Sequence, residues 1–156
     1  MEIERKYLIH KLPENLEAYP RKQIQQAYLC TAPVVRIRKQ DEEYYLTYKG
    51  GGLMVREEYN LPLNREAYLH LLEKADGIIL SKTRYLLPLT QNLTIELDVF
   101  DPPYENLWLA EGEFSTEEEA NAFIPPEWFG EDVTFSSAYH NSVLSRGSAG
   151  KNRVKK

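Results

Sequence analysis

Charged residues recur two positions apart along several segments of this 156-residue chain that otherwise resemble β-strands. Residues i and i+2 of a strand point to the same side, so each pair shares one face, opposite apolar residues such as Val35 and Ile37. The basic residues of these segments are Lys6, Arg36, Arg38, Lys49 (which ends a further strand-like run without a charged residue two positions away), Arg56, Lys82 and Arg84, and the acidic residues are Glu2, Glu4, Glu58, Glu96, Asp98, Glu111 and Glu113. Arginine and lysine bind phosphate oxygens, and hard divalent cations bind carboxylates. A sheet closed with these residues inward would form a polar cavity for a polyanion and its metal ions.

The alternative is that these charges form the solvated face of an ordinary antiparallel sheet, which is the usual explanation for a single pair. The repetition over seven segments favours the inward arrangement, as does the grouping of most pairs by sign. Burying unpaired ions destabilises a fold strongly, so the balance of seven basic and seven acidic residues is a condition for such an interior.

Composition limits the class of protein. The length suits one domain, and 42% hydrophobic with 12% aromatic residues suits a globular one. We expect no membrane partner, because no apolar stretch approaches the roughly 20 residues of a membrane span. The chain begins with a charged strand rather than a secretory signal pattern, and Cys30 has no second cysteine to pair with. We therefore expect a cytoplasmic protein.

The charge is unevenly distributed along the chain. Residues 145–156 carry five of the 19 basic residues, which leaves 14 basic against 24 acidic residues in positions 1–144. An acidic body argues against nucleic-acid binding. We expect a folded domain over residues 1–144, a flexible basic tail over residues 145–156, and a monomer or homodimer.

The pattern of elements predicts an α+β, mainly β, fold. Strands are expected over residues 1–10, 23–31, 34–40, 44–49, 53–63, 78–88, 93–100 and 107–114, with turns at Pro33 and Gly50-Gly51-Gly52. Helices are expected over 65–75, with Asn64 as N-cap and Gly77 as C′ residue, over 117–123, and over 139–144. Trp128 and Phe129 are expected to cover the barrel end. The predicted architecture is a closed eight-stranded antiparallel β-barrel, or tunnel, with a few flanking helices.

Several motifs resemble a known family in sequence order. Glu2-Ile3-Glu4-Arg5-Lys6 resembles the E-x-E-x-K signature of the CYTH domain, the triphosphate tunnel metalloenzyme superfamily. Counterparts of further family motifs occur at residues 26–29, 35–38, 46–50, 56–58, 82–85, 96–100 and 109–113, so the resemblance spans residues 2–144. It implies a tunnel that binds a small-molecule triphosphate and uses Mg²⁺ or Mn²⁺.

The resemblance and the residue chemistry together suggest roles. Phosphate contacts are assigned to Lys6, Arg36, Arg38, Lys49, Arg56, Lys82 and Arg84. Metal contacts are assigned to Glu2, Glu4, Glu96, Asp98, Glu111 and Glu113, with Glu58 as a weaker seventh. The catalytic residues are Lys82, Glu111 and Glu113. Lys82 is expected to accept the proton of the attacking water, because neighbouring cations lower a lysine pKa; a simple phosphate contact is the open alternative. Tyr28 either orients a phosphate or, as we favour, packs the wall.

The expected activity is metal-dependent hydrolysis of inorganic triphosphate to pyrophosphate and phosphate. The alternatives are a class IV-type adenylate cyclase, a thiamine triphosphatase, or a non-catalytic polyphosphate- or nucleotide-binding module. Two departures from the family pattern bear on substrate grip. Asn60 stands where members often carry an acid, and Ser136-Ser137-Ala138-Tyr139 replaces a D-x-R-Y-like segment, which removes a possible anchor at the tunnel mouth or plug helix.

Overall fold

The computed structural model describes residues 1–146, which form ten strands, three α-helices and two 3₁₀ turns. The strands are β1 (Glu2–Ile9), β2 (Arg21–Thr31), β3 (Val34–Gln40), β4 (Glu43–Lys49), β5 (Val55–Arg56), β6 (Glu58–Leu63), β7 (Asp76–Thr90), β8 (Leu93–Phe100), β9 (Trp108–Glu113) and β10 (Phe129–Asp132). The helices are α1 (Arg65–Leu72), α2 (Glu117–Ala122) and α3 (Asn141–Leu144), and the 3₁₀ turns are η1 (Leu16–Ala18) and η2 (Ser137–Tyr139).

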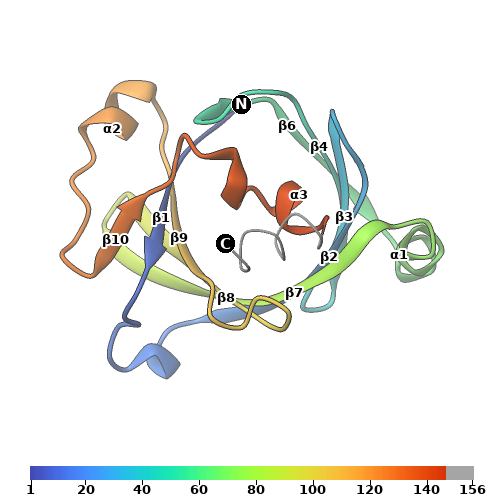
Figure 1. Ribbon diagram of the computed structural model, residues 1–156, viewed down its shortest axis with the longest axis horizontal. Coiled ribbons are helices and arrows are strands. Elements are labelled where there is room, and N and C mark those ends of the chain that lie inside the picture. The colour runs from blue at the N-terminus through green and yellow to red at the C-terminus, as the bar shows by residue number, and fades with distance from the viewer. Residues whose placement is uncertain (147–156) are drawn as a thin grey trace.

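The strands form a nearly closed antiparallel barrel (Figure 1). Its order is β1-β9-β8-β7-β2-β3-β4-β6, and β5 completes the ring by pairing with β1 at Glu2↔Arg56 and Ile3↔Val55. Only Glu57 separates β5 from β6, so these two correspond to the single strand predicted over residues 53–63. With β5 and β6 taken together, the predicted eight-stranded barrel is confirmed.

The prediction missed β10, a short strand that pairs with β1 in the sheet on the edge opposite β9. Phe129 is the register partner of Ile9, and its ring lies 5.0 Å from that of Tyr7. Trp128 and Phe129 pack on the apolar cluster that contains Ile9 and Leu97. The expectation that they cover the barrel end is therefore wrong. They pack against outward-facing residues of β1 on the outside of the barrel wall.

Helix α1 covers the opposite side of the barrel (Figure 1). Asn64 is its N-cap as predicted, since Asn64 Oδ1 accepts a hydrogen bond from Ala67 N at 2.7 Å. Tyr68 packs there on Ile37 and Ala27, the outward residues of β3 and β2. The helix ends at Leu72, earlier than predicted, and Gly77 lies inside β7 with φ +79°, where a Cβ atom would stand 2.2 Å from Ser145 O.

The inward faces of the strands change character along the barrel. At one end they are apolar, and Leu80, Phe100 and Leu109 pack there on Leu144 of α3. Tyr104 donates a hydrogen bond to Leu144 O at 2.8 Å, and Ile78 N donates to Ser145 O at 2.6 Å. The C-terminal segment thus runs inside the ring of strands (Figure 1) and occupies this end. Charged residues line the remaining interior.

The predicted basic tail falls largely on residues 147–156, outside the described residues. Residues 145 and 146 are described, and Ser145 is fully buried. Within the described residues, no helix has the length and apolar character needed to cross a membrane.

Candidate active site

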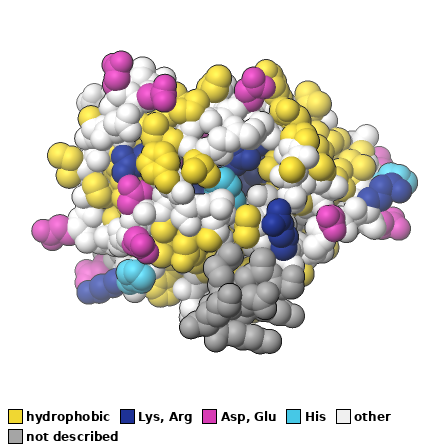
Figure 2. Space-filling view, turned by 45° about the horizontal axis from the view of Figure 1, so that its top comes forward, with side chains coloured by type: hydrophobic (Ala, Val, Ile, Leu, Met, Phe, Trp, Pro, Cys, Tyr) yellow, Lys and Arg dark blue, Asp and Glu magenta, His cyan; other side chains and the backbone are white. Residues whose placement is uncertain are grey.

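The charged part of the barrel encloses a cavity of about 370 Å³. Figure 2 shows basic side chains recessed in a hollow near the middle of one face, framed by hydrophobic ones. Every predicted site residue except Asp98 lines the cavity, and so does Glu58. The prediction omitted several neutral or weakly basic lining residues, namely Val34, Gln40, Tyr45, Thr47, His140, Asn141 and Ser142. The last three come from the C-terminal segment, whose sequence carries no strand alternation to mark an inward face.

One side of the cavity is crowded with buried cations. Arg36 and Arg38 come from β3 and Arg84 from β7, and all three line the cavity. Burial, followed by the charges of Arg36 and Arg84, lowers the pKa of Arg38 to about 9. Arg36 donates to Thr47 Oγ1 at 3.2 Å, but its Nε is buried with no hydrogen-bond partner among the described residues. The unpaired Arg36 Nε could donate a hydrogen bond to an anion, and the negative charge of that anion would relieve the repulsion among the three arginines.

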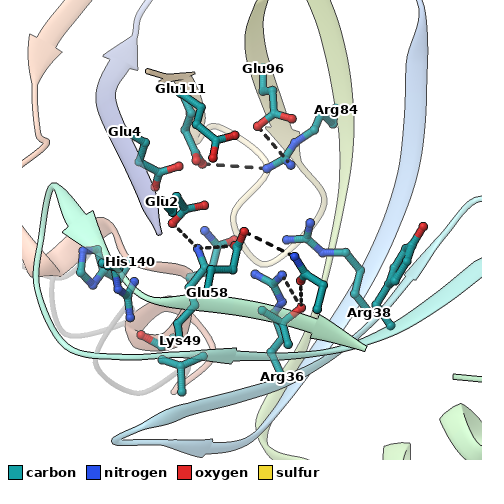
Figure 3. Close-up of a pocket in the computed structure, with 18 of the residues that line it drawn as sticks. Glu2, Glu4, Arg36, Arg38, Lys49, Glu58, Arg84, Glu96, Glu111 and His140 are labelled. Carbon is teal, nitrogen blue, oxygen red and sulfur yellow. Dashed lines mark hydrogen bonds and ion pairs between the residues drawn. The ribbon is translucent and has the colours of Figure 1, made fainter. Parts of the chain in front are cut away.

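The other side holds carboxylates (Figure 3). Glu2 and Glu4 come from β1 and Glu111 and Glu113 from β9, with Glu4 and Glu113 directly paired across the two strands. Burial, then Glu111 and Glu2, raises the pKa of Glu4 well above its usual value, and burial, then Glu2 and Glu58, raises that of Glu113. Crowded carboxylates of this kind suit a hard divalent cation.

In the present arrangement, lysines and arginines neutralise these carboxylates. Lys49 Nζ lies 2.9 Å from Glu2 and 3.5 Å from Glu58. Lys6 and Arg84 approach Glu111 at 4.0 and 3.9 Å, and with Lys82 they outweigh the effect of burial and hold the Glu111 pKa well below its usual value. Within residues 1–146 no three acidic, histidine or cysteine side chains are grouped closely enough to hold a metal ion. Binding of a metal ion and a phosphate would therefore break these ion pairs. The metal ion would contact the carboxylates, and the phosphate would contact the lysines and arginines.

Asp98 does not line the cavity, although it was predicted as a metal ligand. Its side chain is fully buried, and it accepts hydrogen bonds from Arg84 Nε and Nη2 at 2.7 and 2.9 Å. Lys82 Nζ lies 2.7 Å from the same carboxylate. Asp98 is thus the counter-ion that holds two cations in the wall.

Lys82 lies between Asp98 and the C-terminal segment. Its Nζ donates to Asn141 Oδ1 at 3.1 Å and lies 5.2 Å from the centre of the Phe100 ring. Burial lowers the pKa of Lys82 to about 7; Arg84 and Arg38 add to this, while Asp98 opposes it. Although Lys82 is part of the cavity wall, its side chain has no exposed surface. A water molecule therefore cannot touch Nζ in this arrangement.

Asn60 and the segment that replaces the D-x-R-Y-like motif both form hydrogen bonds with the barrel. Asn60 Oδ1 accepts from Thr47 Oγ1 at 2.6 Å, so the amide continues a polar cross-strand chain where an acid was expected. Near the replaced D-x-R-Y-like segment, Tyr139 O accepts from Lys6 Nζ at 3.3 Å. The C-terminal segment is thus attached to the barrel through this carbonyl and through Asn141.

The fold and the site together define the class of this protein: it is a nearly closed antiparallel β-barrel with a charged cavity inside. Comparison with known proteins gives the family. Residues 1–133 match the family model described as "CYTH domain". The chain belongs to the CYTH domain family.

Two curated relatives have the same name. The inorganic triphosphatase of Nitrosomonas europaea is 39% identical over 148 residues, covering 92% of this chain and 96% of that protein. The inorganic triphosphatase of Acetivibrio thermocellus is 34% identical over 115 residues, covering 70% of each. Among solved structures, that of the inorganic triphosphatase NE1496 is 36% identical with a TM-score of 0.70, covering 94% of this chain and 95% of that one. A Hippeastrum protein, HpAC1, shares the fold at 16% identity, with a TM-score of 0.60 and coverage of 78% and 83%.

Proposed function

We propose that this protein is a metal-dependent inorganic triphosphatase that cleaves triphosphate to pyrophosphate and phosphate. The observation that carries the proposal is one cavity lined both by arginines that lie close to one another and by carboxylates that lie close to one another. Burial and neighbouring like charges disfavour the charged forms of Arg38, Glu4 and Glu113, and a triphosphate with a divalent metal would supply the missing counter-charges. The names of the two curated relatives agree with this substrate.

The metal would be held by Glu2, Glu4, Glu111 and Glu113, with Glu96 and Glu58 at the margin. Mg²⁺ and Mn²⁺ both suit oxygen ligands. When bound, such an ion neutralises charge on the phosphoryl oxygens and polarises phosphorus. Asp98 is not included in this set, because its carboxylate is engaged by Arg84 and Lys82.

The arginines and lysines would hold the substrate for in-line attack. Arg36 and Arg38 supply guanidinium donors from one strand, Arg84 does so from β7 and Arg56 from β5, while Lys6 and Lys49 act as point charges. Water attacks a terminal phosphorus, a new P–O bond forms, and the bond to the bridging oxygen breaks. Pyrophosphate leaves with the bridging oxygen, and the proton of the water passes to an acceptor.

Lys82 is the candidate proton acceptor, because a pKa of about 7 leaves much of it neutral near neutral pH. That role requires Asn141 or Asp98 to release the amine during turnover, since Nζ is covered. If Lys82 instead acts on the substrate through its hydrogen bond to Asn141, its amine does not have to be released. The expected cytoplasmic location, the monomeric or homodimeric state and the absence of a nucleic-acid partner stay predictions.

The test is phosphate release from inorganic triphosphate, ATP and thiamine triphosphate, each with Mg²⁺, Mn²⁺ or EDTA. We expect fast, metal-dependent release from inorganic triphosphate and much slower release from ATP. Faster turnover of ATP or thiamine triphosphate would reassign the substrate. Triphosphate binding without release from any substrate would show a non-catalytic binding protein. Glu111→Gln should be inactive, whereas Glu105→Gln, the same change on the exposed surface, should behave as the wild type.

A further inference from the structure

A chain of hydrogen bonds fixes the orientation of two side-chain amides beside the cavity. Arg38 Nε and Nη2 both donate to one end of Gln26, at 2.9 and 2.6 Å. A guanidinium has donors and no acceptor, so that end of Gln26 must be its oxygen. The nitrogen of Gln26 therefore faces Asn141 and donates to Asn141 Oδ1 at 2.9 Å. Gln26 is fully buried, which holds this arrangement in place.

Lys82 confirms the same orientation of Asn141 from the other side. In its protonated form Lys82 also has only donors, and Nζ lies 3.1 Å from Asn141 Oδ1. With the oxygen committed to Gln26 and Lys82, the amide nitrogen of Asn141 points away from both. Reversing the amide would set donors against donors at two contacts.

Asn141 lines the cavity, and its amide nitrogen forms no hydrogen bond within residues 1–146. Asn141 is half-buried and lines the cavity. Within residues 1–146 no hydrogen bond is formed by Asn141 Nδ2, whereas Oδ1 forms two. Nor is Nδ2 among the buried side-chain atoms of these residues that lack a partner, which are Glu2 Oε1, Tyr7 OH and Arg36 Nε. The nitrogen is therefore accessible and has two donors to offer.

We propose that Asn141 is a substrate-binding residue whose Nδ2 donates to a phosphate oxygen of the bound triphosphate. This inference rests on the proposed function, because it assumes that a triphosphate occupies the cavity. The same contact gives Lys82 an effect on the substrate although its side chain is covered. An ammonium donating to the amide oxygen polarises the amide and strengthens its N–H donors. Asn141 belongs to α3, so the contacted phosphate lies at the end of the cavity that the C-terminal segment closes.

The test is triphosphate affinity measured by calorimetry in EDTA, without turnover, for Asn141→Leu and Asn141→Asp. Asn141→Leu should weaken binding about 3- to 10-fold, the effect of one neutral hydrogen bond. Asn141→Asp keeps an oxygen for Gln26 and Lys82 but turns an anionic oxygen toward the phosphate, so its loss should be about 30-fold or more. Asn121→Asp, the same charge change on the exposed helix α2, should bind as the wild type does.

Equal affinity of Asn141→Leu and the wild type would overturn the proposal, as would equal losses in Asn141→Leu and Asn141→Asp. If a variant fails to fold, the wild-type protein still decides. The side-chain NH₂ signals of Asn141 in a ¹H–¹⁵N spectrum should shift when triphosphate is added, and unshifted signals would refute the contact. Hydrolysis is measured separately. If the wild type binds triphosphate without cleaving it, the proposed function is refuted, and the affinities of the Asn141 variants still test this inference. If the wild type does not bind triphosphate, both are refuted.

Discussion

Replacing Asp98 by asparagine should strongly destabilise the fold. The substitution preserves shape but removes the carboxylate charge that three contacts of 2.7–2.9 Å join to Arg84 and Lys82. Both cations would stay buried with their closest counter-charge gone. Breaking a buried ion pair in this way costs about 3–5 kcal/mol. For a domain of this size, that corresponds to a decrease in melting temperature of roughly 6–20 °C.

Glu96→Gln is the matched control for this change. Glu96 lies two residues away on the same strand and also contacts Arg84, but at 3.4 Å and with a side chain that is 39% exposed. Solvent screens such a contact, so we expect a loss of at most about 1 kcal/mol. Urea unfolding followed by the fluorescence of the two tryptophans would measure both variants. Equal losses in the two variants, or a loss below about 1 kcal/mol for Asp98→Asn, would refute the argument from burial.

The pH dependence provides a second measurement on the same variant. Arg84 and Lys82 outweigh the effect of burial and hold the Asp98 pKa below its usual value. The stability that this contributes is present above the unfolded-state pKa of about 3.9 and is lost as pH falls through the lower folded-state pKa. The difference between wild type and Asp98→Asn should therefore shrink only in strong acid. If the stability difference between wild type and Asp98→Asn already disappears near pH 6, a group other than Asp98 causes the pH dependence.

Three further predictions concern the cavity. Arg38→Ala should raise the KM for triphosphate about 10-fold or more in steady-state assays, whereas Arg21→Ala on the exposed start of β2 should not; an unchanged KM would exclude Arg38 from the phosphate contacts. Glu111→Gln should abolish metal-dependent turnover while calorimetry in EDTA still detects triphosphate binding, and retained activity would exclude Glu111 from the mechanism. Burial, then Lys6 and Arg56, lowers the His140 pKa to about 4, so urea midpoints should fall as pH drops from about 6.5 towards 4 because the unfolded state binds the proton first. His140→Gln should fall less over that range, and an identical fall would contradict the shift.

The barrel and most of the lining could be predicted because a strand has a strict two-residue period. Arg36 and Arg38 must share a face, and Ile37 between them must face the other way, where it packs under α1. The same rule could not separate Glu96 from Asp98. They have the same parity, but Asp98 is the register partner of Arg84 and is covered by it, and only the pairing of β7 with β8 shows this.

The contributions of the C-terminal segment could not be derived from periodicity. His140, Asn141 and Ser142 lie in a short irregular stretch whose position depends on the packing of Leu144 inside the barrel. The sequence alone does not mark Gln26, because its complete burial and its place opposite Arg38 on the inward face of β2 depend on the pairing of β2 with β3. Phe129 was misplaced because an aromatic residue can cover a barrel end or a barrel wall, and sequence does not distinguish the two.

The closure of the barrel at β5 has a consequence for how the protein opens. Two residue pairs join β1 to β5, whereas five join β1 to β9 on its other edge. This seam should be the first part of the wall to separate in thermal fluctuations, so the amide protons of Val55 and Arg56 should exchange with deuterium faster than those in the centre of β8. Glu2 and Arg56 face each other across the seam, and both line the cavity. Bound triphosphate and metal would join the two edges, so slow exchange at the seam would report an occupied cavity without any measurement of phosphate release.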